Sequence, residues 1–220
     1  MNDDIRALIF DLDGVLCATD GYHYLAWKDL ADRLRLPFDR QLNDRLRGIS
    51  RMDSLNVILN AAGKKLPEEE KLRLAEEKNE IYRRYLQRMT PASVPPEVRP
   101  VLEALRERGY LLAVGSSSKN AGTILERTGL SECFDAVADG TDISRSKPDP
   151  EVFLKAAEKL RTPPACCAVI EDAKTGIEAA KAAGMTAIAF FGDAAGCGPE
   201  DFSLSAFSDL LRLFPGRTPS

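Results

Sequence analysis

Short apolar segments alternate with amphipathic helical segments along most of this chain, and this alternation limits the possible folds more than any other feature. The apolar segments, at residues 5–10, 111–115, 136–138, 167–170 and 187–191, are predicted strands. Segments such as PEVRPVLEALRERG and PEVFLKAAEKLR lie between them and have the periodicity of helices. Strand–helix alternation predicts right-handed crossovers and a parallel sheet covered by helices on both faces. We therefore predict an α/β fold with a Rossmann-like, doubly wound parallel sheet as its core.

Residues 16–94 interrupt the alternation. Their sequence has helical patterns at 22–36, 53–62 and 67–89 and no convincing strand. TPASVPP ends this block before the alternation resumes. We predict an all-helical domain at 16–94, inserted after the first strand of a core domain made of 1–15 and 95–220. Within the helix predicted at 67–89, Lys78 falls in an apolar stripe, where a lysine either extends past the packing to water or faces a wet, anionic cleft.

The charge and cysteine content exclude several classes of partner. The net charge is −4 and the isoelectric point is about 5.3, which argues against nucleic-acid binding. The N-terminal segment MNDDIRALIF has no apolar stretch long enough for a signal peptide or a membrane span. Five cysteines, an odd number without metal-binding spacing, suit free thiols in a reducing compartment. We expect a cytoplasmic monomer with no nucleic-acid or membrane partner.

Two carboxylates stand at the end of the first predicted strand. Asp11 and Asp13 follow the apolar run, and Gly14 comes directly after them. One aspartate at such a place is commonly a turn residue or a helix cap. Two of them crowd like charges, which lowers stability unless a cation or a proton is present. Gly14 would permit a tight backbone bend there, although an ordinary turn uses glycine in the same way.

The ends of three other predicted strands carry matching chemistry. A run of hydroxyl, lysine and amide side chains follows 111–115, a lysine sits between serine and proline in SRSKPDP, and two acids follow 167–170. These residues are Ser116, Ser117, Ser118, Lys119, Asn120, Lys147, Glu171 and Asp172. Each group taken alone could be a helix cap, a surface lysine or a favourable charge at a helix N-terminus. All of them meet at one edge of a parallel sheet, however, and that edge is where such sheets bind ligands.

The combination predicts a cation site beside an anion site. Asp11, Asp13 and Asp172 offer the hard oxygen ligands that Mg²⁺ takes in phosphoryl-transfer sites. Ser116 and Lys147 would hold phosphoryl oxygens, while the metal offsets the repulsion between a phosphate and an attacking carboxylate. We therefore predict phosphoryl transfer through an aspartyl phosphate.

Four motifs, DLDGV, GSSSKN, SKPDP and VIEDAKTG, make the chain resemble the haloacid dehalogenase superfamily of phosphotransferases. They occur in the order of that family and span the whole predicted core. The resemblance implies that Asp11 is the nucleophile and Asp13 the general acid/base. It also implies that Asp11, the backbone carbonyl of Asp13, and Asp172 bind Mg²⁺ with Glu171 close by. The insert at 16–94 corresponds to the helical cap of the family.

The predicted cap adds a narrower likeness. TDGYHYLAWK, LRGISRMDSL and EEKNEIY are similar to cap segments of hexose-phosphate mutases within this superfamily. The likeness implies an enzyme that interconverts β-glucose 1-phosphate and glucose 6-phosphate through an aspartyl-phosphate enzyme and β-glucose 1,6-bisphosphate. Two departures from the pattern are Ala173, where serine is expected, and Arg47, where lysine is usual.

The same likeness implies roles for residues of the cap and of the serine-rich loop. His23 would help Asp13 into its catalytic position, although a lone histidine is more often simply buried. Arg51 would bind the phosphate that is not transferred, although it could also be an exposed arginine at a helix start. The substrate and phosphate site implied in this way consists of Arg47, Gly48, Arg51, Lys78, Ser116, Ser117, Ser118, Lys119, Asn120 and Lys147.

Two other functions stay open from the sequence. One is a phosphatase of the same superfamily that acts on a sugar phosphate or on phosphoglycolate. The other is a phosphate-sensing module, in which an aspartate at a strand end is a passive phosphoacceptor. Asp13 argues against the second, because a passive phosphoacceptor has little use for a general acid/base.

Overall fold

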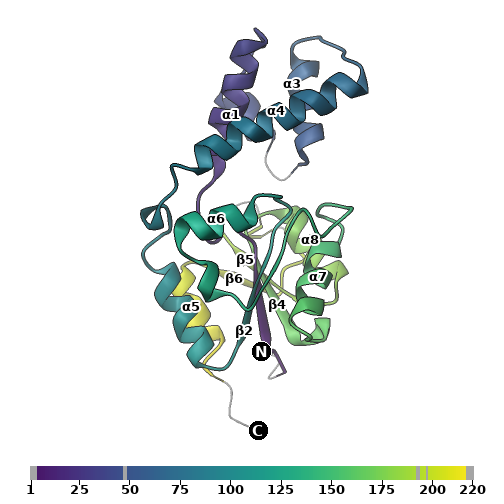
Figure 1. Ribbon diagram of the computed structural model, residues 1–220. Helices are drawn as coiled ribbons and strands as arrows, with labels where there is room; N and C mark the ends of the chain where they lie inside the picture. The colour runs from purple at the N-terminus through teal and green to yellow at the C-terminus, as the bar shows by residue number, and fades with distance from the viewer. Residues whose placement is uncertain (1–3, 47–48, 192–193, 197, 217–220) are drawn as a thin grey trace. The chain divides into compact units, whose positions relative to one another are not determined.

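The computed structural model describes residues 4–46, 49–191, 194–196 and 198–216 (Figure 1). The chain divides into two compact units, Met1–Ala18 with Thr90–Ser220, and Thr19–Met89. We call the first the core unit and the second the helical unit. Among the described residues, no helix is long and apolar enough to cross a membrane.

The core unit contains a six-stranded sheet that is entirely parallel, as the sequence predicts, although only five of its strands were predicted. Its strands are β1 (Ala7–Phe10), β2 (Leu111–Gly115), β3 (Ala136–Ala138), β4 (Cys167–Glu171), β5 (Thr186–Phe190) and β6 (Phe202–Leu204). The order across the sheet is β3-β2-β1-β4-β5-β6. The strand order therefore reverses between β1 and β4, and a ligand site is expected beyond the carboxyl ends of these two strands.

Helices cover both faces of this sheet. The core unit has α5 (Val98–Glu107), α6 (Ala121–Thr128), α7 (Glu151–Lys159), α8 (Lys174–Ala182) and α9 (Leu210–Leu213), besides short 3-10 turns. In Figure 1, α7 and α8 lie on one side of the sheet and α5 on the other. The doubly wound architecture predicted from the alternation is confirmed.

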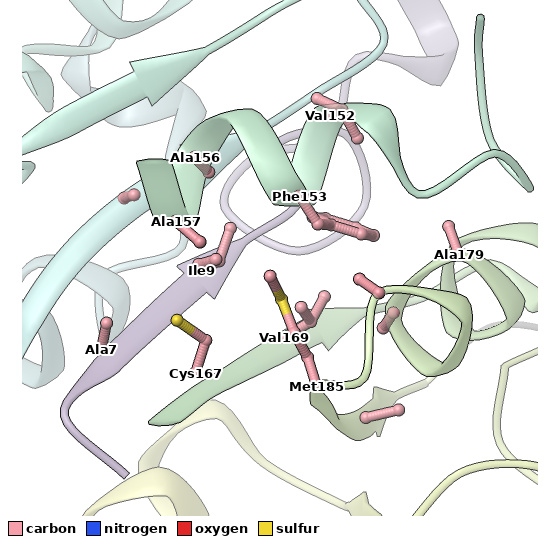
Figure 2. Packing of buried hydrophobic residues seen from close by; sticks show 14 of the residues in the cluster. Ala7, Ile9, Val152, Phe153, Ala156, Ala157, Cys167, Val169, Ala179 and Met185 are labelled. Atoms are coloured by element: carbon pink, nitrogen blue, oxygen red, sulfur yellow. The ribbon is translucent and has the colours of Figure 1, made fainter. Parts of the chain in front are cut away.

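The packing beneath α7 and α8 follows from sequence periodicity. Along α7, Val152, Phe153 and Ala156 are buried, at a spacing that places them on one helix face. They pack against Ile9 of β1 and Val169 of β4 (Figure 2). Burying a side chain such as Phe153 contributes roughly 2 to 3 kcal/mol. The helix and the two strands that end at the candidate site are thus joined by one apolar cluster.

The helical unit contains α1 (Asp20–Arg33), α2 (Arg40–Asp44), α3 (Arg51–Ala61) and α4 (Glu68–Leu86). Its described residues include no strand, in agreement with the sequence. α1 packs against α4, and the buried side chains of α1 include Trp27 and Leu30. The sequence pattern missed α2, a helix of five residues whose start is capped by the carboxylate of Asp39, which accepts a hydrogen bond from the Leu42 N–H at 2.8 Å.

The pattern also missed β6, the edge strand of the sheet. This strand has three residues, and only Leu204 of them is buried. Neither a long apolar run nor a clear alternation marks such a segment, so the sequence carries little signal for it. The strand forms because β5 offers a free edge for pairing, with Ile188 aligned to Phe202.

Candidate active site

The carboxyl ends of β1 and β4 bring three charged side chains together in the core unit. In the sheet register Phe10 aligns with Ile170, so Asp11 and Glu171 lie side by side on neighbouring strands. Lys147 reaches them from the loop before α7: its Nζ donates to Asp11 Oδ1 and, at 2.7 Å, to Glu171 Oε2. All three side chains are at least nine-tenths buried. The ammonium therefore bridges two carboxylates in a nearly dry setting, where an unpaired charge would be strongly destabilising.

Asp172 adds a further carboxylate at the same edge. Carboxylate oxygens of Asp11, Glu171 and Asp172 all lie within 4.8 Å of one another. Burial, and then the charge of Asp11, raises the pKa of Glu171, against the opposing effect of Lys147. Burial, followed by the charges of Glu171 and Asp11, raises the pKa of Asp172. Three crowded oxygen donors, two of them with raised pKa values, fit a hard divalent cation, which would relieve their repulsion.

The charge on Lys147 is set by the same neighbours. Burial acts to lower the pKa of Lys147, but the adjacent Asp11 and Glu171 outweigh it and raise that pKa above its usual value. Lys147 is therefore a permanent cation at neutral pH. It also lies over the ring of Phe153, with Nζ 4.7 Å from the ring centroid.

Gly14 turns the backbone after Asp13, which is partly buried. Its φ is +90°, and a Cβ built on it would lie 2.0 Å from Asp172 Oδ2. Glycine is required here for two reasons, the left-handed backbone and the close approach of a carboxylate. The sequence indicated the first reason only.

Gly176, in α8, has a comparable role that the sequence did not reveal. A Cβ at this position would lie 2.1 Å from the carboxyl carbon of Glu171 and 2.1 Å from its Oε2. The glycine five residues after Glu171 therefore leaves room for the buried carboxylate. Its position in VIEDAKTG is the one signal in the sequence that could have indicated this.

The serine-rich loop follows β2 and leads into α6. Ser116 is buried, its N–H donates to the Ala138 carbonyl at 3.0 Å, and its Oγ accepts from the Ser118 N–H at 3.1 Å. Ser118 Oγ in turn accepts from the Asn120 N–H at 3.2 Å. Within the described residues, the buried Oγ of Ser117 has no hydrogen-bond partner. The loop is thus held in shape by hydrogen bonds between its own hydroxyls and backbone N–H groups.

A second loop supports this one from the end of β3. The Gly140 N–H donates to the Ser118 carbonyl at 3.1 Å, and a Cβ on Gly140 would lie 2.4 Å from the Ser117 carbonyl oxygen. Lys119 is exposed and Asn120 is buried. Gly140 was not among the residues that the sequence indicated, because a single glycine in a loop is too common to be informative.

The helical unit contains its own polar cluster. His23 of α1 stacks on the ring of Tyr82, with 4.0 Å between ring centroids. Lys78 Nζ donates to His23 Nδ1 at 2.8 Å and lies over the rings of Trp27 and Tyr82. Burial, followed by the charges of Lys78 and Arg51, lowers the pKa of His23 well below its usual range. His23 is therefore neutral, with its proton on Nε2. Lys78 is 2% exposed, so it does not extend past the packing to water.

Arg51 is the first residue of α3. Ser50 caps that helix, since its Oγ accepts from the Asp53 N–H at 3.1 Å. Arg51 is partly buried, and its Nη1 lies 3.4 Å from Glu76 Oε2. It is therefore neither an exposed cap arginine nor a tightly paired one. Arg47 and Gly48, also predicted to bind phosphate, lie outside the described residues.

The haloacid dehalogenase-like hydrolase model matches residues 5–184. The chain belongs to this family. The match covers β1 and β2 with Asp11 and Ser116 directly after them, Glu171 at the end of β4, the loop that holds Lys147, and the helical unit.

Comparison with individual members of the haloacid dehalogenase-like family points to more specific activities. A β-phosphoglucomutase from Bacillus subtilis is 44% identical over 186 residues, which cover 84% of this chain and 82% of that protein. A phosphorylated carbohydrates phosphatase from Thermotoga maritima is 32% identical over 187 residues, 84% of each chain. The crystal structure of a β-phosphoglucomutase from Clostridium difficile superposes with a TM-score of 0.85 at 38% identity, covering 94% of this chain and 93% of that one.

Ala173 stands where a serine is expected, and the helix that follows it lacks a side-chain cap. Ala173 has extended backbone angles and stands at the N-cap of α8, which has no side-chain cap. Its N–H donates to Glu171 Oε1 at 3.1 Å. The contact with Glu171 is a backbone contact that any residue could make, so the substitution removes a helix cap and leaves the carboxylate cluster in place.

Proposed function

We propose that the protein is a β-phosphoglucomutase that interconverts β-D-glucose 1-phosphate and glucose 6-phosphate through an aspartyl phosphate and β-glucose 1,6-bisphosphate. The observation that carries this proposal is the pair of cationic centres, Lys147 in the core unit and Arg51 with Lys78 in the helical unit. A bisphosphate intermediate has two phosphates, and a mutase must bind both while it transfers one. The similarity to the β-phosphoglucomutases of Bacillus subtilis and Clostridium difficile supports the same reaction.

The reaction begins with Asp11 in its phosphorylated form. The free hydroxyl of β-glucose 1-phosphate forms a bond to the phosphorus as the bond between phosphorus and Asp11 breaks, and Asp13 accepts the hydroxyl proton, which gives β-glucose 1,6-bisphosphate. An Asp11 oxygen then forms a bond to the phosphorus of the 1-phosphate as the bond from that phosphorus to the sugar oxygen breaks, and Asp13 gives its proton to the sugar oxygen, which releases glucose 6-phosphate and restores phosphorylated Asp11. Lys147 donates a hydrogen bond to Asp11 and would neutralise oxygens of the phosphoryl group.

We assign a Mg²⁺ site to Asp11 and Asp172, with the backbone carbonyl of Asp13 as a further ligand and Glu171 adjacent. The bound ion would supply charge neutralisation between the phosphate and the attacking carboxylate. Ser116, Ser117, Ser118, Lys119 and Asn120 are assigned to oxyanion binding in the core unit.

We assign the second phosphate to Arg51, whose guanidinium can donate two hydrogen bonds to one phosphate. We assign Arg47, Gly48 and Lys78 to the same proposed site. His23 is assigned the placement of Asp13 for proton transfer. The helical unit would act as a cap that excludes water from the aspartyl phosphate, which is what separates a mutase from a phosphatase. A monomer in the cytoplasm stays our prediction.

The second candidate is a sugar-phosphate phosphatase, and the Thermotoga maritima relative is the observation that favours it. The two reactions share every core residue and differ in what attacks the aspartyl phosphate, a sugar hydroxyl or water.

Purified protein with Mg²⁺, β-glucose 1-phosphate and a catalytic amount of β-glucose 1,6-bisphosphate separates the two. A dehydrogenase-coupled assay measures glucose 6-phosphate, and a colorimetric assay on the same sample measures free phosphate. A mutase forms glucose 6-phosphate with little phosphate released. Stoichiometric phosphate release with no net glucose 6-phosphate would contradict our proposal.

Two variants test the roles proposed for Asp13 and Arg51. Asp13→Asn should lower kcat by about 10² to 10⁴-fold, the usual contribution of a general acid/base. Arg51→Ala should weaken hexose phosphate turnover far more than the hydrolysis of acetyl phosphate, which has no second anionic group. Arg73→Ala is the matched control, because Arg73 is an exposed arginine of the helical unit paired with Glu70.

A further inference from the structure

The loop that carries Lys147 has an unusual combination of exposure and order. Ser144, Arg145 and Ser146 are exposed, whereas the side chain of Lys147 is 9% exposed and bridges Asp11 and Glu171. Ile143, before this segment, packs against the apolar cluster under α7, and the exposed residues that follow it depend on hydrogen bonds for their backbone position.

One side chain supplies most of these hydrogen bonds. Glu151 Oε2 accepts from the Ser144 N–H at 2.9 Å and from the Arg145 N–H at 2.8 Å. The Ser144 hydroxyl donates to the same carboxylate, at 3.0 Å to Oε2 and 3.3 Å to Oε1. Two consecutive backbone amides of the loop are thus held by one carboxylate, two and three residues before Lys147.

Glu151 is itself fixed by the helix that it begins. It is the first residue of α7, and the next two residues, Val152 and Phe153, are fully buried against the sheet. The Glu151 N–H donates to Asp149 Oδ1 at 3.1 Å, and Asp149 also pairs with Arg145 at 2.9 Å. The sheet therefore fixes α7, and α7 fixes the loop through Glu151.

We propose that Glu151 is a positioning residue for Lys147: its carboxylate binds the backbone of Ser144 and Arg145 and so fixes the distance of the Lys147 ammonium from Asp11. The proposal rests on the proposed phosphoryl transfer through Asp11, since it assigns Glu151 to that reaction. Its physical part, the placement of Lys147, can be measured without turnover.

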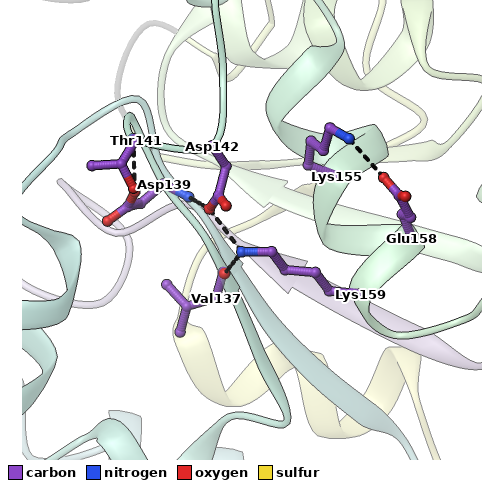
Figure 3. Close-up of polar contacts among 7 residues, drawn as sticks. All are labelled: Val137, Asp139, Thr141, Asp142, Lys155, Glu158 and Lys159. Carbon is purple, nitrogen blue, oxygen red and sulfur yellow. Dashed lines mark hydrogen bonds and ion pairs between the residues drawn. The ribbon is translucent and has the colours of Figure 1, made fainter.

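The same helix offers a matched control. Glu158 lies near the other end of α7 and pairs with Lys155 at 2.8 Å, as Figure 3 shows. Lys159, the last residue of α7, binds the Val137 carbonyl and Asp142 at 2.7 Å each (Figure 3). Glu158→Gln therefore removes a carboxylate from the same helix without a change at the loop before Lys147.

The first measurement is the reactivity of the Lys147 amine. The protein is acetylated with an N-hydroxysuccinimide ester, and labelling of Lys147 relative to Lys174, an exposed lysine of α8, is followed by peptide mass spectrometry. Glu151→Gln leaves a neutral amide oxygen, a weaker acceptor than a carboxylate, for the two backbone N–H groups. The loop should therefore open more often, and labelling of Lys147 should rise roughly fivefold or more. Glu158→Gln should label like the wild type.

The second measurement is phosphorylation of Asp11 by acetyl phosphate, with hydrolysis followed as phosphate release. Glu151→Gln should lower kcat about tenfold or more, because a small misplacement of a catalytic group is costly, and should leave KM within about twofold. Glu151→Asp, which keeps the charge at the helix start but is one methylene shorter, should shift in the same direction. In a Lys147→Ala background, Glu151→Gln should have little further effect.

The outcomes separate the two proposals. If the wild type never forms a phosphoenzyme but Glu151→Gln exposes Lys147, the proposed function fails and the positioning stands. If both Glu151 variants match Glu158→Gln in labelling and in kcat, with an active wild type, the positioning fails and the function stands. Equal losses from Glu151→Gln with and without Lys147 would assign Glu151 a general structural role and overturn the inference.

Discussion

Lys78 Nζ donates to Nδ1 of His23, the one histidine of the chain, across 2.8 Å. Both residues sit inside the helical unit, among the rings of Trp27 and Tyr82. Aromatic faces and a neutral imidazole are a favourable environment for an ammonium removed from water. A protonated imidazole would not accept this hydrogen bond and would add a second positive charge. The packing of the helical unit thus depends on the protonation state of His23.

The stability of the helical unit should therefore fall in mild acid. The pKa of His23 in the folded state is lowered, by burial first and then by Lys78 and Arg51, whereas in the unfolded state it is about 6.5. Below that pH the unfolded chain binds a proton that the folded chain does not, so the free energy of unfolding decreases as the pH falls. One proton contributes at most about 1.4 kcal/mol per pH unit.

Urea unfolding at pH 7.5 and pH 5.5 measures this effect. Fluorescence of Trp27, the one tryptophan, reports on the helical unit. His23→Gln retains an acceptor for Lys78 but does not titrate, so the loss of stability between the two pH values should be smaller in this variant. Equal losses in the variant and the wild type would show that His23 does not carry the pH dependence.

Gly14→Ala should be more destabilising than its backbone angle alone explains. A left-handed backbone costs a non-glycine residue roughly 1 kcal/mol, and the Cβ at Gly14 would also lie 2.0 Å from Asp172 Oδ2. Gly109 is the matched control, with φ +84° and no atom near its Cβ within 4 Å. We expect Gly109→Ala to lower the free energy of unfolding by about 1 kcal/mol and Gly14→Ala to lower it further and to abolish activity. Similar losses in both variants would contradict the contact with Asp172.

Ala173→Ser should stabilise the core unit. Ala173 occupies the N-cap of α8 with an extended backbone and no side-chain cap. Serine at an N-cap is typically worth about 1 kcal/mol relative to alanine. The prediction is a rise of that size in the free energy of unfolding from denaturant titration, while Ala183→Ser, at the other end of α8, should bring no gain. A destabilised Ala173→Ser would mean that the hydroxyl disturbs the neighbouring carboxylates.

The sequence predicted the fold well where residues repeat with a period. Five of the strands and the helical nature of the insert follow from apolar periodicity. Because the strands are parallel, the polar residues that follow them gather at one end of the sheet. The short elements β6 and α2 were missed because three to five residues carry too little periodicity. They form through pairing with β5 and through the cap from Asp39.

The sequence predicted which residues form the candidate site, but only some of the contacts between them. The meeting of Asp11, Lys147 and Glu171 was expected, because all three lie at strand ends or beside them. The steric role of Gly140 depends on the Ser117 backbone that approaches it in space, which no spacing in the sequence encodes, and that of Gly176 is indicated only by its position in VIEDAKTG. The partnership of Lys78 with His23 likewise joins residues 55 positions apart.

The carboxylates at the ends of β1 and β4 predict a thermal response to Mg²⁺. Asp11, Glu171 and Asp172 bring oxygens within 4.8 Å of one another, and the raised pKa values of Glu171 and Asp172 show that their charges oppose folding. A cation that binds only the folded state adds about 2.7 kcal/mol at a hundredfold excess over its Kd. At this chain length each kcal/mol raises Tm by about 2 to 4 °C.

Removal of one carboxylate should raise Tm in the absence of Mg²⁺ and reduce the further rise in Tm that Mg²⁺ causes. Without Mg²⁺, Asp172→Asn should raise Tm, because it relieves the repulsion that burial intensifies. With Mg²⁺, the same variant should show little further rise, because a ligand is lost. Glu178→Gln is the control, an exposed acid of α8 paired with Lys174, and should behave like the wild type. Differential scanning calorimetry in EDTA and in excess Mg²⁺ measures all three proteins. A wild type with the same Tm in both buffers, or an Asp172→Asn protein that still gains from Mg²⁺, would place the metal elsewhere.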